Sequence, residues 1–528
     1  MRLKKLYIQK FKNLKSFSID FENSYYVSVL LGKNGTGKSN LFEFLTMIFK
    51  SLDLASSHYR FKSIFLADLN QFGETVPIFS LEYTINNNLI RIEIINDTLK
   101  IRDLRRSSNI PFTQFKKSLF PEHVVGYYSG RNQRFEKLYN KHIENAEQMI
   151  INVKRAHERK ATQELIAFQE NRIIPENEKI KIPIESFRPL FYAKNKYSQL
   201  LLLTLFVFKD SNQAISDLLS KYLKIDGFVR FFVTLKSPKF NSTLSCYDEI
   251  EKFWGVAGSS LDCASFLYRV SERSLKLPEE EVNEMRIDSR IKEAVVLFID
   301  ANSFVENVVE EYDNDPSEMF RHLESLYLSD LLHEITLVVR RGEDEISFSN
   351  LSEGEQQMIV TLGLLIITGK KNSLYLMDEP DTHLNPKWQR DYINIIKSLV
   401  QDSDNSHILI GTHSPFMPQA VKGSDLILFK REDGHPKIHK IHNMHTWKID
   451  QILTSELYEL ETTRASDIEV KLLRLDELLL KESLTEIELE EKKELDAELQ
   501  NLAIGRNSEE VNTINELKEI ARILKEVQ

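Results

Sequence analysis

The chain has 528 residues, with 42% hydrophobic and 28% charged side chains, a balance that excludes wholesale disorder and fibrous repeats. This length allows roughly two to four domains and a large hydrophobic core. Its two cysteines, Cys246 and Cys263, are too few for a disulfide framework, a four-cysteine zinc site or an iron–sulfur cluster, and they fit a reducing cytosol.

Charge and hydropathy are unevenly distributed along the chain. The longest strongly apolar run, residues 200–208, is far shorter than the ~20 residues of a bilayer span, so we expect it in the core. Residues 1–5 lead into alternation rather than an apolar block, which predicts no signal peptide, no membrane contact and a cytoplasmic bacterial protein. Residues 451–528 hold 20 acidic and 10 basic side chains, which equals the net charge of −10, so a separate tail module is expected.

The first motif is a glycine-rich loop at residues 32–39, which reads G-x-x-x-x-G-K-S. A short apolar strand is predicted before it, over residues 26–31, and an apolar helical pattern follows from Leu41. This order is the context of a P-loop, whose backbone N–H groups cradle phosphate oxygens. Lys38 is expected to reach the β- and γ-phosphates, and the Ser39 hydroxyl to ligate Mg²⁺. The predicted nucleotide-binding residues of this loop are Gly32, Asn34, Gly35, Thr36, Gly37, Lys38, Ser39 and Asn40.

A long segment without such motifs follows the loop. It has no sustained heptad run and no pair of cysteines in a metal-binding spacing. The pattern predicts a β-meander over residues 79–101 and a strand over 228–235. Amphipathic helices are predicted over 131–170 and 270–330. We therefore expect a compact helical lobe inserted into the surrounding domain.

Two clusters of basic residues are candidates for contact with a nucleic-acid backbone. Residues 1–15 hold six Lys and Arg and no acid, and residues 131–160 hold eight against four acids. Such clusters can track phosphates. Exposed lysines on a strand edge explain the first cluster better, and a solvated helix face is an equal alternative for the second.

Three further motifs lie in the second half of the chain. L-S-E-G-E at residues 351–355 opens an apolar helix, an apolar strand over 374–377 ends in Asp378 and Glu379, and a strand over 407–411 leads to His413. Taken singly, each has a bland alternative: a capped helix start with an acidic first turn, a chance acidic strand end, and a structural histidine.

In this order and spacing, the four motifs resemble the ATP-binding-cassette (ABC) superfamily, and in particular its DNA-associated branch of SMC, RecF and OLD-like ATPases. The resemblance implies that Asp378 holds Mg²⁺, that Glu379 polarises the attacking water, and that His413 senses the γ-phosphate. A glutamine is also expected to sense Mg²⁺ and the γ-phosphate. Gln133 is the candidate, with a surface glutamine as the alternative.

The resemblance also implies a second copy of the chain. Ser352, Gly354 and Glu355 would contact the ATP held by the other copy, and Asp381 would lie in a loop that crosses to it. Glu353 and Glu355 depart from the usual L-S-G-G-Q pattern of the superfamily. A glutamate at the position of Glu355 is frequent in the DNA-associated branch.

The tail after residue 446 contains no nuclease motif but several predicted helices. Helices are predicted over 467–480 and 508–527, and Thr485 opens a capping box with a further helix behind it. One helix carries an apolar stripe that needs a cover, formed by Leu472, Leu473, Leu475, Leu479 and Leu480. The layout and the segment 447–455 resemble the ATPase subunit of Septu-type antiphage systems, also found beside retrons, in which the nuclease is a separate HNH protein.

The sequence therefore predicts an α/β protein, an ABC-type ATPase head with a parallel P-loop sheet and an antiparallel β subdomain. The expected segments are the N-terminal half of the head at 1–130, a helical insertion lobe at 131–330, the C-terminal half of the head at 331–446, and an acidic helical tail at 447–528.

The predicted function is binding and hydrolysis of ATP with Mg²⁺ by a homodimer or higher homo-oligomer. This cycle would regulate a separate HNH-type nuclease in antiphage defence, with DNA or retron RNA/DNA as candidate ligands. The alternatives are a RecF/SMC-like DNA-repair ATPase and a nucleotide-gated scaffold with little turnover.

Overall fold

The structure is a computed structural model that describes residues 1–500 with short gaps. The gaps are 22–25, 74–77, 96–97, 131–132, 176–177, 184–187, 239–249, 278–292, 369–371, 400–405, 422–425, 433, 441–443, 456, 459, 461–463 and 482–483. The predicted helix over 508–527 lies outside the described residues. The chain divides into two compact units, Met1–Ile449 and Asp450–Gln528.

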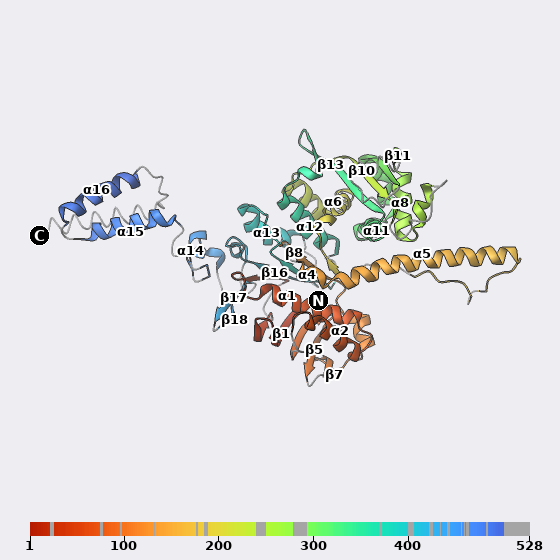
Figure 1. The fold of residues 1–528 in the computed structure, drawn as a ribbon, viewed down its shortest axis with the longest axis horizontal. Coiled ribbons are helices and arrows are strands. Elements are labelled where there is room, and N and C mark those ends of the chain that lie inside the picture. The colour runs from red at the N-terminus through yellow and green to blue at the C-terminus, as the bar shows by residue number, and fades with distance from the viewer. Residues whose placement is uncertain are drawn as a thin grey trace. The chain divides into compact units, whose positions relative to one another are not determined.

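A seven-stranded sheet forms the centre of the first unit (Figure 1). Its order is β18-β17-β3-β16-β15-β8-β9, and all neighbouring pairs are parallel except β17 with β18. Its strands are β3 (Val27–Leu31), β8 (Val124–Tyr128), β9 (Leu190–Tyr192), β15 (Leu374–Asp378), β16 (His407–Thr412), β17 (Leu426–Glu432) and β18 (His435–Lys440). Strands β3, β15 and β16 are buried along their whole length, as expected for parallel strands covered on both faces. Because β3 pairs with β16, and β16 with β15, the motifs from the two ends of the chain meet at one edge.

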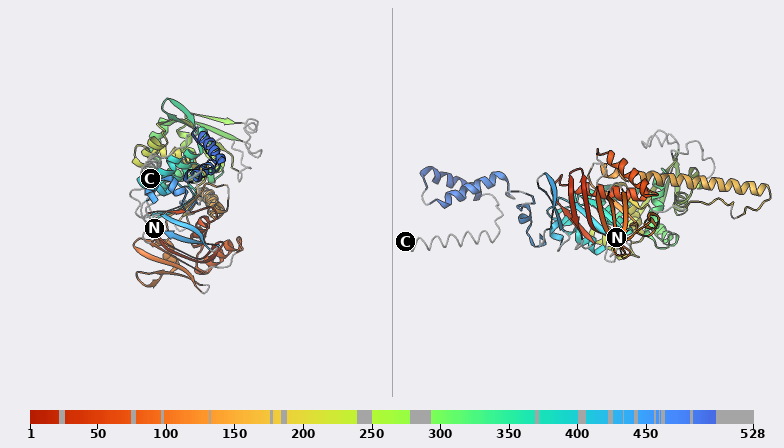
Figure 2. Two further views of the ribbon diagram at one scale, coloured as in Figure 1. Left: turned by 90° about the vertical axis from the view of Figure 1, so that its left-hand side faces the viewer. Right: turned by 90° about the horizontal axis from the view of Figure 1, so that it is seen from below.

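A six-stranded antiparallel sheet packs beside the central one, in the order β2-β1-β4-β5-β6-β7. Its strands are β1 (Arg2–Phe11), β2 (Leu14–Asp20), β4 (Phe79–Ile85), β5 (Asn88–Ile95), β6 (Thr98–Asp103) and β7 (Ser108–Asn109). The β-meander expected over 79–101 is confirmed. The right-hand view of Figure 2 shows these strands side by side, in red and orange.

Two helices bury the inner face of this antiparallel sheet. They are α1 (Lys38–Leu54) and α2 (His58–Asn70). The rings of Phe11, Phe44, Phe65 and Phe79 meet between helices and sheet, with centroids 5.1 to 5.9 Å apart. Aromatic pairs at this distance stabilise a core beyond the area they bury. The first turn of α1, which carries Lys38, is therefore held against a rigid core.

The inserted lobe contains a five-stranded antiparallel sheet besides its helices, where the sequence predicted a helical lobe with one strand, and two strands of this sheet lie beyond the predicted end of the lobe at residue 330. The order is β11-β12-β10-β13-β14. The strands are β10 (Gly227–Lys236), β11 (Arg273–Leu277), β12 (Ala294–Asp300), β13 (Leu332–Arg341) and β14 (Asp344–Ser347). The strand predicted over 228–235 is confirmed as β10. The helices predicted over 270–330 are confirmed from residue 301, whereas 273–277 and 294–300 are strands and 278–292 lie outside the described residues. Strand β12 is rich in branched residues, and its burial alternates with period two.

Helices complete the first unit. Those of the lobe and of the central domain are α3 (Phe112–Ser118), α4 (Arg134–Lys137), α5 (Asn140–Gln169), α6 (Ser198–Val207), α7 (Gln213–Ser216), the π-helix η2 (Asp217–Tyr222), α8 (Ser259–Arg269), α10 (Ala301–Glu311), α11 (Pro316–Leu328), α12 (Glu353–Thr368) and α13 (Pro386–Leu399). The apolar run 200–208 lies in the core, as predicted, mostly as α6. Gly363 of α12 lets α6 approach closely, since a Cβ there would lie 3.1 Å from Leu205 Cδ1. Of the helices in the described residues, none is both long and apolar enough to span a bilayer.

The second unit is described through two helices that pack on each other. Helix α14 (Ile449–Leu453) precedes them, and the pair is α15 (Ser466–Leu480) and α16 (Glu486–Gln500). The capping box is confirmed, because Glu488 Oε2 accepts from the Thr485 amide and hydroxyl, both at 3.0 Å. The apolar stripe of α15 is covered in part by α16. Leu472 and Leu475 are buried, whereas Leu473 and Leu479 remain exposed.

Candidate functional site

The P-loop connects the buried strand β3 to helix α1. Gly35 has φ of +79° and Gly37 of +105°, conformations that only glycine adopts without strain. A Cβ on Gly37 would also lie 2.9 Å from Leu14 Cδ2. Asn13, in the turn between β1 and β2, fastens the loop: its amide donates to Gly35 O at 3.0 Å and accepts from Asn40 at 2.7 Å. The glycines therefore stand where the chain must turn tightly under a neighbouring strand pair.

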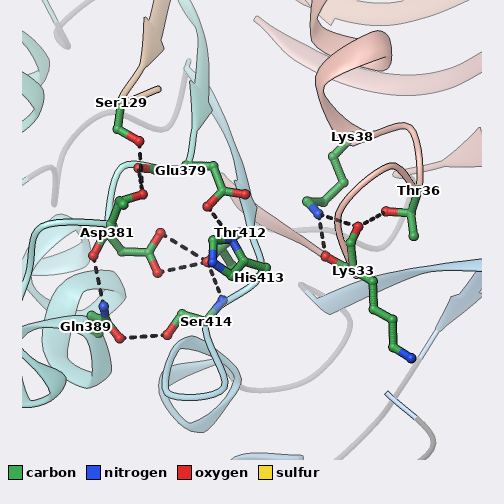
Figure 3. A network of polar contacts seen from close by, with 12 residues as sticks. Lys33, Thr36, Lys38, Ser129, Glu379, Asp381, Gln389, Thr412, His413 and Ser414 are labelled. Atoms are coloured by element: carbon green, nitrogen blue, oxygen red, sulfur yellow. Dashed lines mark hydrogen bonds and ion pairs between the residues drawn. The ribbon is translucent and has the colours of Figure 1, made fainter. Parts of the chain in front are cut away.

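Lys38 begins α1 and folds back over the loop. Its ammonium donates to Gly32 O and, at 3.2 Å, to Lys33 O (Figure 3). Burial lowers the pKa of Lys38, and three nearby carboxylates oppose that shift. These belong to Glu379, Asp378 and Asp381. A buried cation that donates to two carbonyls of the glycine-rich loop and lies near three acids fits a phosphate-binding lysine.

Asp378 ends β15, buried beside the first turn of α1. Burial raises the pKa of Asp378 to about 7, and a hydrogen bond from the Ser39 hydroxyl opposes that rise. Its Oδ1 atom has no hydrogen-bond partner among the described residues. Gly411 on β16 leaves room for this oxygen, since a Cβ there would lie 2.8 Å from it.

Asp378 and Ser39 fit Mg²⁺, because a buried open carboxylate oxygen and a hydroxyl are hard oxygen ligands. In the part of the chain that the structure describes, no cluster of three or more His, Cys, Asp and Glu side chains could hold a metal. Mg²⁺ in nucleotide sites relies on one or two protein ligands, with phosphate oxygens and water supplying the rest.

Glu379 follows Asp378 in a left-handed backbone conformation, with φ of +58°. Its amide donates to Gly411 O at 2.7 Å, which fixes the turn at the end of β15. The Glu379 carboxylate contacts His413 Nδ1 (Figure 3). This hydrogen bond raises the pKa of His413, whose side chain is half exposed. A carboxylate oriented by a histidine at the cavity wall can accept a proton from water.

Asp381 lies in the loop after β15, but its carboxylate points inward. The Thr412 hydroxyl lies 2.8 and 3.0 Å from the two carboxylate oxygens (Figure 3), and burial raises the pKa of Asp381 to about 6. Thr412 Oγ1 also accepts from the Ser414 amide at 2.9 Å. The exposed residues of the loop are Thr382, His383 and Asn385. The Asp381 side chain therefore joins two loops of its own chain, and the crossing of its loop to a second copy stays a prediction.

A cavity of about 690 Å³ lies between these groups. Its wall is formed by residues 34–40, Tyr128, Ser129, Gly130, Arg134, Glu379, Thr382, His383 and His413. Gln133 is not part of this wall; it is an exposed residue at the N-terminus of α4. In this structure Gln133 agrees with the surface alternative, and Ser129 and Arg134 line the cavity beside it.

The L-S-E-G-E motif forms the N-terminus of α12 and supplies no residue to this wall, although it contacts the wall residue His383. The capped helix start that stood as the bland alternative is present, because Glu355 Oε2 accepts from the Ser352 amide at 2.8 Å and hydroxyl at 3.0 Å. A Cβ on Gly354 would lie 2.5 Å from His383 O, so the loop after Glu379 presses on the helix start. Gln357 adds a buried bridge: it donates to Glu379 O at 3.4 Å and accepts from the His383 amide at 3.2 Å.

The fold and the site together define an ABC-type ATPase head. One edge of its parallel sheet gathers the P-loop, the Asp-Glu strand end and the histidine. Residues 1–417 match the AAA ATPase domain family, and the chain belongs to that family.

The similar curated proteins are distant. The retron Vc95 probable ATPase of Vibrio cholerae serotype O1 biovar El Tor is 23% identical over 242 residues, 43% of this chain and 41% of that protein. Septu protein PtuA of Bacillus thuringiensis is 29% identical over 147 residues, 24% of this chain and 36% of that protein. Septu protein PtuA of Bacillus mycoides (strain KBAB4) is 22% identical over 411 residues, 74% of this chain and 54% of that protein. The chain thus matches less than two thirds of each relative.

Solved structures that match the chain include the SMC head domain of Pyrococcus furiosus bound to the C-terminal domain of ScpA. Its TM-score is 0.34 at 14% identity, over 84% of this chain and 96% of that one. The recombination mediator RecF with ATP has a TM-score of 0.31 at 14% identity, over 83% of this chain and 97% of that one.

Proposed function

We propose that this chain hydrolyses ATP with Mg²⁺ in sites that a second copy completes, and that this cycle controls a separate HNH-type nuclease in antiphage defence. One observation carries the first part. Lys38, Glu379 and His413 line one cavity, whereas Ser352 and Gly354 do not belong to its wall. The motif lies at a helix N-terminus, which suits a phosphate, but outside the cavity of its own chain. It can therefore bind the phosphate that a second copy holds.

Within the cavity, each side chain has a distinct task. Lys38 and the P-loop N–H groups bind and neutralise the β- and γ-phosphates. Glu379, oriented by His413, accepts the proton of the attacking water. Ser39 and Asp378 would hold Mg²⁺, which neutralises charge on the phosphate oxygens when bound. Closure by Ser352 and Gly354 of the other copy would exclude water and fix the γ-phosphate for attack.

Turnover and assembly of the full-length chain test this proposal. We expect Mg²⁺-dependent ATP hydrolysis that EDTA abolishes, and a Glu379→Gln variant that binds ATP and accumulates as a dimer by analytical ultracentrifugation. Lys38→Ala is the matched control, because it removes the phosphate-facing ammonium and should neither bind ATP nor dimerise with it. Parental turnover by Glu379→Gln would contradict the role given to this carboxylate. ATP binding without any turnover by the parent would favour the scaffold alternative.

The defence role and the nuclease partner rest on other support. Similar proteins are named Septu protein PtuA and retron probable ATPase, and the tail forms a unit of its own with exposed Leu473 and Leu479. We place the nuclease-docking surface on this tail. Removing residues 450–528 should then leave ATP binding intact and abolish co-purification of the proposed HNH-type nuclease partner.

Leu473→Glu with Leu479→Glu in the full chain should have the same effect, because a carboxylate on an apolar contact is costly to bury. Asp476→Asn is the control, an exposed change on the same helix that should preserve binding. A tail-less protein that still holds the nuclease would refute this placement. DNA gap or end binding without a nuclease partner would favour the repair alternative.

A further inference from the structure

An ion pair joins the L-S-E-G-E motif at residues 351–355, here called the signature motif, to the sheet of the inserted lobe. Arg341, the last residue of β13, places Nη2 2.6 Å from Glu355 Oε1. The same nitrogen donates to Leu223 O at 3.0 Å, at the end of η2. The Arg341 side chain is 31% exposed and that of Glu355 12% exposed, so water and salt screen the pair less than a surface ion pair.

The Glu355 carboxylate lies at a helix N-terminus where a phosphate would bind, so its negative charge opposes phosphate binding there. Its second oxygen, Oε2, accepts from the Ser352 amide and hydroxyl at the positive end of α12. These are the donors that a phosphate from another copy would need. An incoming triphosphate must therefore displace this oxygen, and the displaced carboxylate would then lie beside several negative charges. Without a counter-charge, the two anions would repel each other in a partly desolvated contact.

We propose that Arg341 is the positioning residue that makes this acidic signature compatible with the triphosphate of a second copy. The proposal rests on the head-to-tail site of the proposed function. Arg341 holds Glu355 through Oε1, so Oε2 can release Ser352 while the carboxylate stays neutralised. Arg341 belongs to the lobe sheet and is held in place by η2. Both elements thus stabilise the motif that closes the other copy's site.

The neighbouring charges point the same way. His383 Nδ1 lies 3.1 Å from Glu353 Oε2, so the other acid of the motif has its own partner in the loop after Glu379. Arg340, one residue before Arg341, is exposed on the opposite side of β13 and therefore offers a matched control. Of the two adjacent arginines, Arg341 is the one paired with the signature motif.

A double-mutant cycle tests the proposal in the full-length chain. The readout is the association constant of the dimer formed with a non-hydrolysable ATP analogue, measured by analytical ultracentrifugation. Arg341→Ala should weaken association by about tenfold or more, whereas Arg340→Ala should stay within about threefold of the parent, and Glu355→Gln gives the reference value for the double variant. Combining Arg341→Ala with Glu355→Gln should restore association, because no unpaired carboxylate then remains. A merely structural role of Arg341 predicts no such rescue.

Two results would overturn the inference: parental association by Arg341→Ala, or a double variant no better than Arg341→Ala. Nucleotide binding by the Lys38 half of the site, measured on the monomer at low protein concentration, should be unchanged in every variant. If Arg341→Ala melts early, Arg341→Gln repeats the cycle, since its amide can still donate to Leu223 O without the charge. A parent that binds the analogue without dimerising would instead refute the proposed function.

Discussion

A methyl group added at Gly411 would contact the carboxylate of Asp378, the proposed metal ligand. It pairs in register with Asp378 across β15 and β16. In Gly411→Ala, the new Cβ would lie 2.8 Å from Asp378 Oδ1 and 2.9 Å from Phe42 Cε2. Both neighbours are buried, so neither side chain can swing into solvent.

The cost of this substitution follows from packing. Overpacking of a buried site by one methyl costs about 1–3 kcal/mol, because the backbone or the side chains must shift. The Phe42 ring is held by the core around α1, so the shift falls largely on the Asp378 carboxylate. Displacing a metal ligand by even a fraction of an ångström disturbs the alignment of the phosphates. We expect kcat/KM for ATP to fall by about tenfold or more, with a raised Mg²⁺ requirement.

The assay is steady-state ATP hydrolysis across a Mg²⁺ titration, together with thermal melting. Gly227→Ala is the control: it lies on β10 with only ordinary contact at 3.4 Å to Arg340 Cβ, and should keep turnover within about twofold of the parent. A folded Gly411→Ala protein with parental turnover and parental Mg²⁺ dependence would refute the placement of the metal beside Asp378.

Three further predictions concern the surroundings of the site. Thr412→Val should lower stability by about 1–3 kcal/mol in thermal melting, because it strands the buried Asp381 carboxylate, whereas Thr412→Ser should not. Asn13→Ala should weaken ATP binding several-fold in a fluorescent-nucleotide titration, because it releases the P-loop at Gly35. His407 is buried, and burial lowers its pKa to about 3, so the folded protein keeps it neutral while the unfolded chain binds a proton below pH ~6.5. The free energy of unfolding should therefore fall by about 2 kcal/mol between pH 7 and pH 5 because of His407 alone. In His407→Gln, the fall measured over the same pH range should be smaller by this amount.

The P-loop strand, its helix and the ends of β15 and β16 could be predicted because local pattern and chemistry agree there. Apolar strands run directly into residues whose side chains suit phosphate, metal or water. The β-meander over 79–101 could also be predicted, because apolar and polar residues alternate along it. The capping box of Thr485 was predicted for the same reason, since its whole mechanism lies within four residues.

Other features depend on partners far away in the chain. The residues of β12 lie within a segment that the sequence predicted as helical. They form a strand because they pair with β10 and β11. Nothing near Gln133 shows that the chain turns away from the cavity there, and nothing near Asp381 shows that Thr412 will bury its carboxylate. Arg341 belongs to a lobe strand, so its pairing with Glu355 follows from the register of β13 rather than from any motif.

Complementation between two inactive variants tests the central claim most directly. Lys38→Ala lacks the phosphate-binding half of the site, and Ser352→Arg blocks the signature half. In a head-to-tail dimer, a mixed pair joins the intact Lys38 of one copy to the intact Ser352 of the other, and so contains one complete site. We predict that each variant alone is inactive and that an equimolar mixture recovers at most about half of parental ATP turnover, because a mixed dimer holds one complete site of two and Lys38→Ala forms no ATP-bound dimer with itself. A mixture as inactive as its components, with Ser352→Arg still binding ATP, would contradict a site shared between two copies.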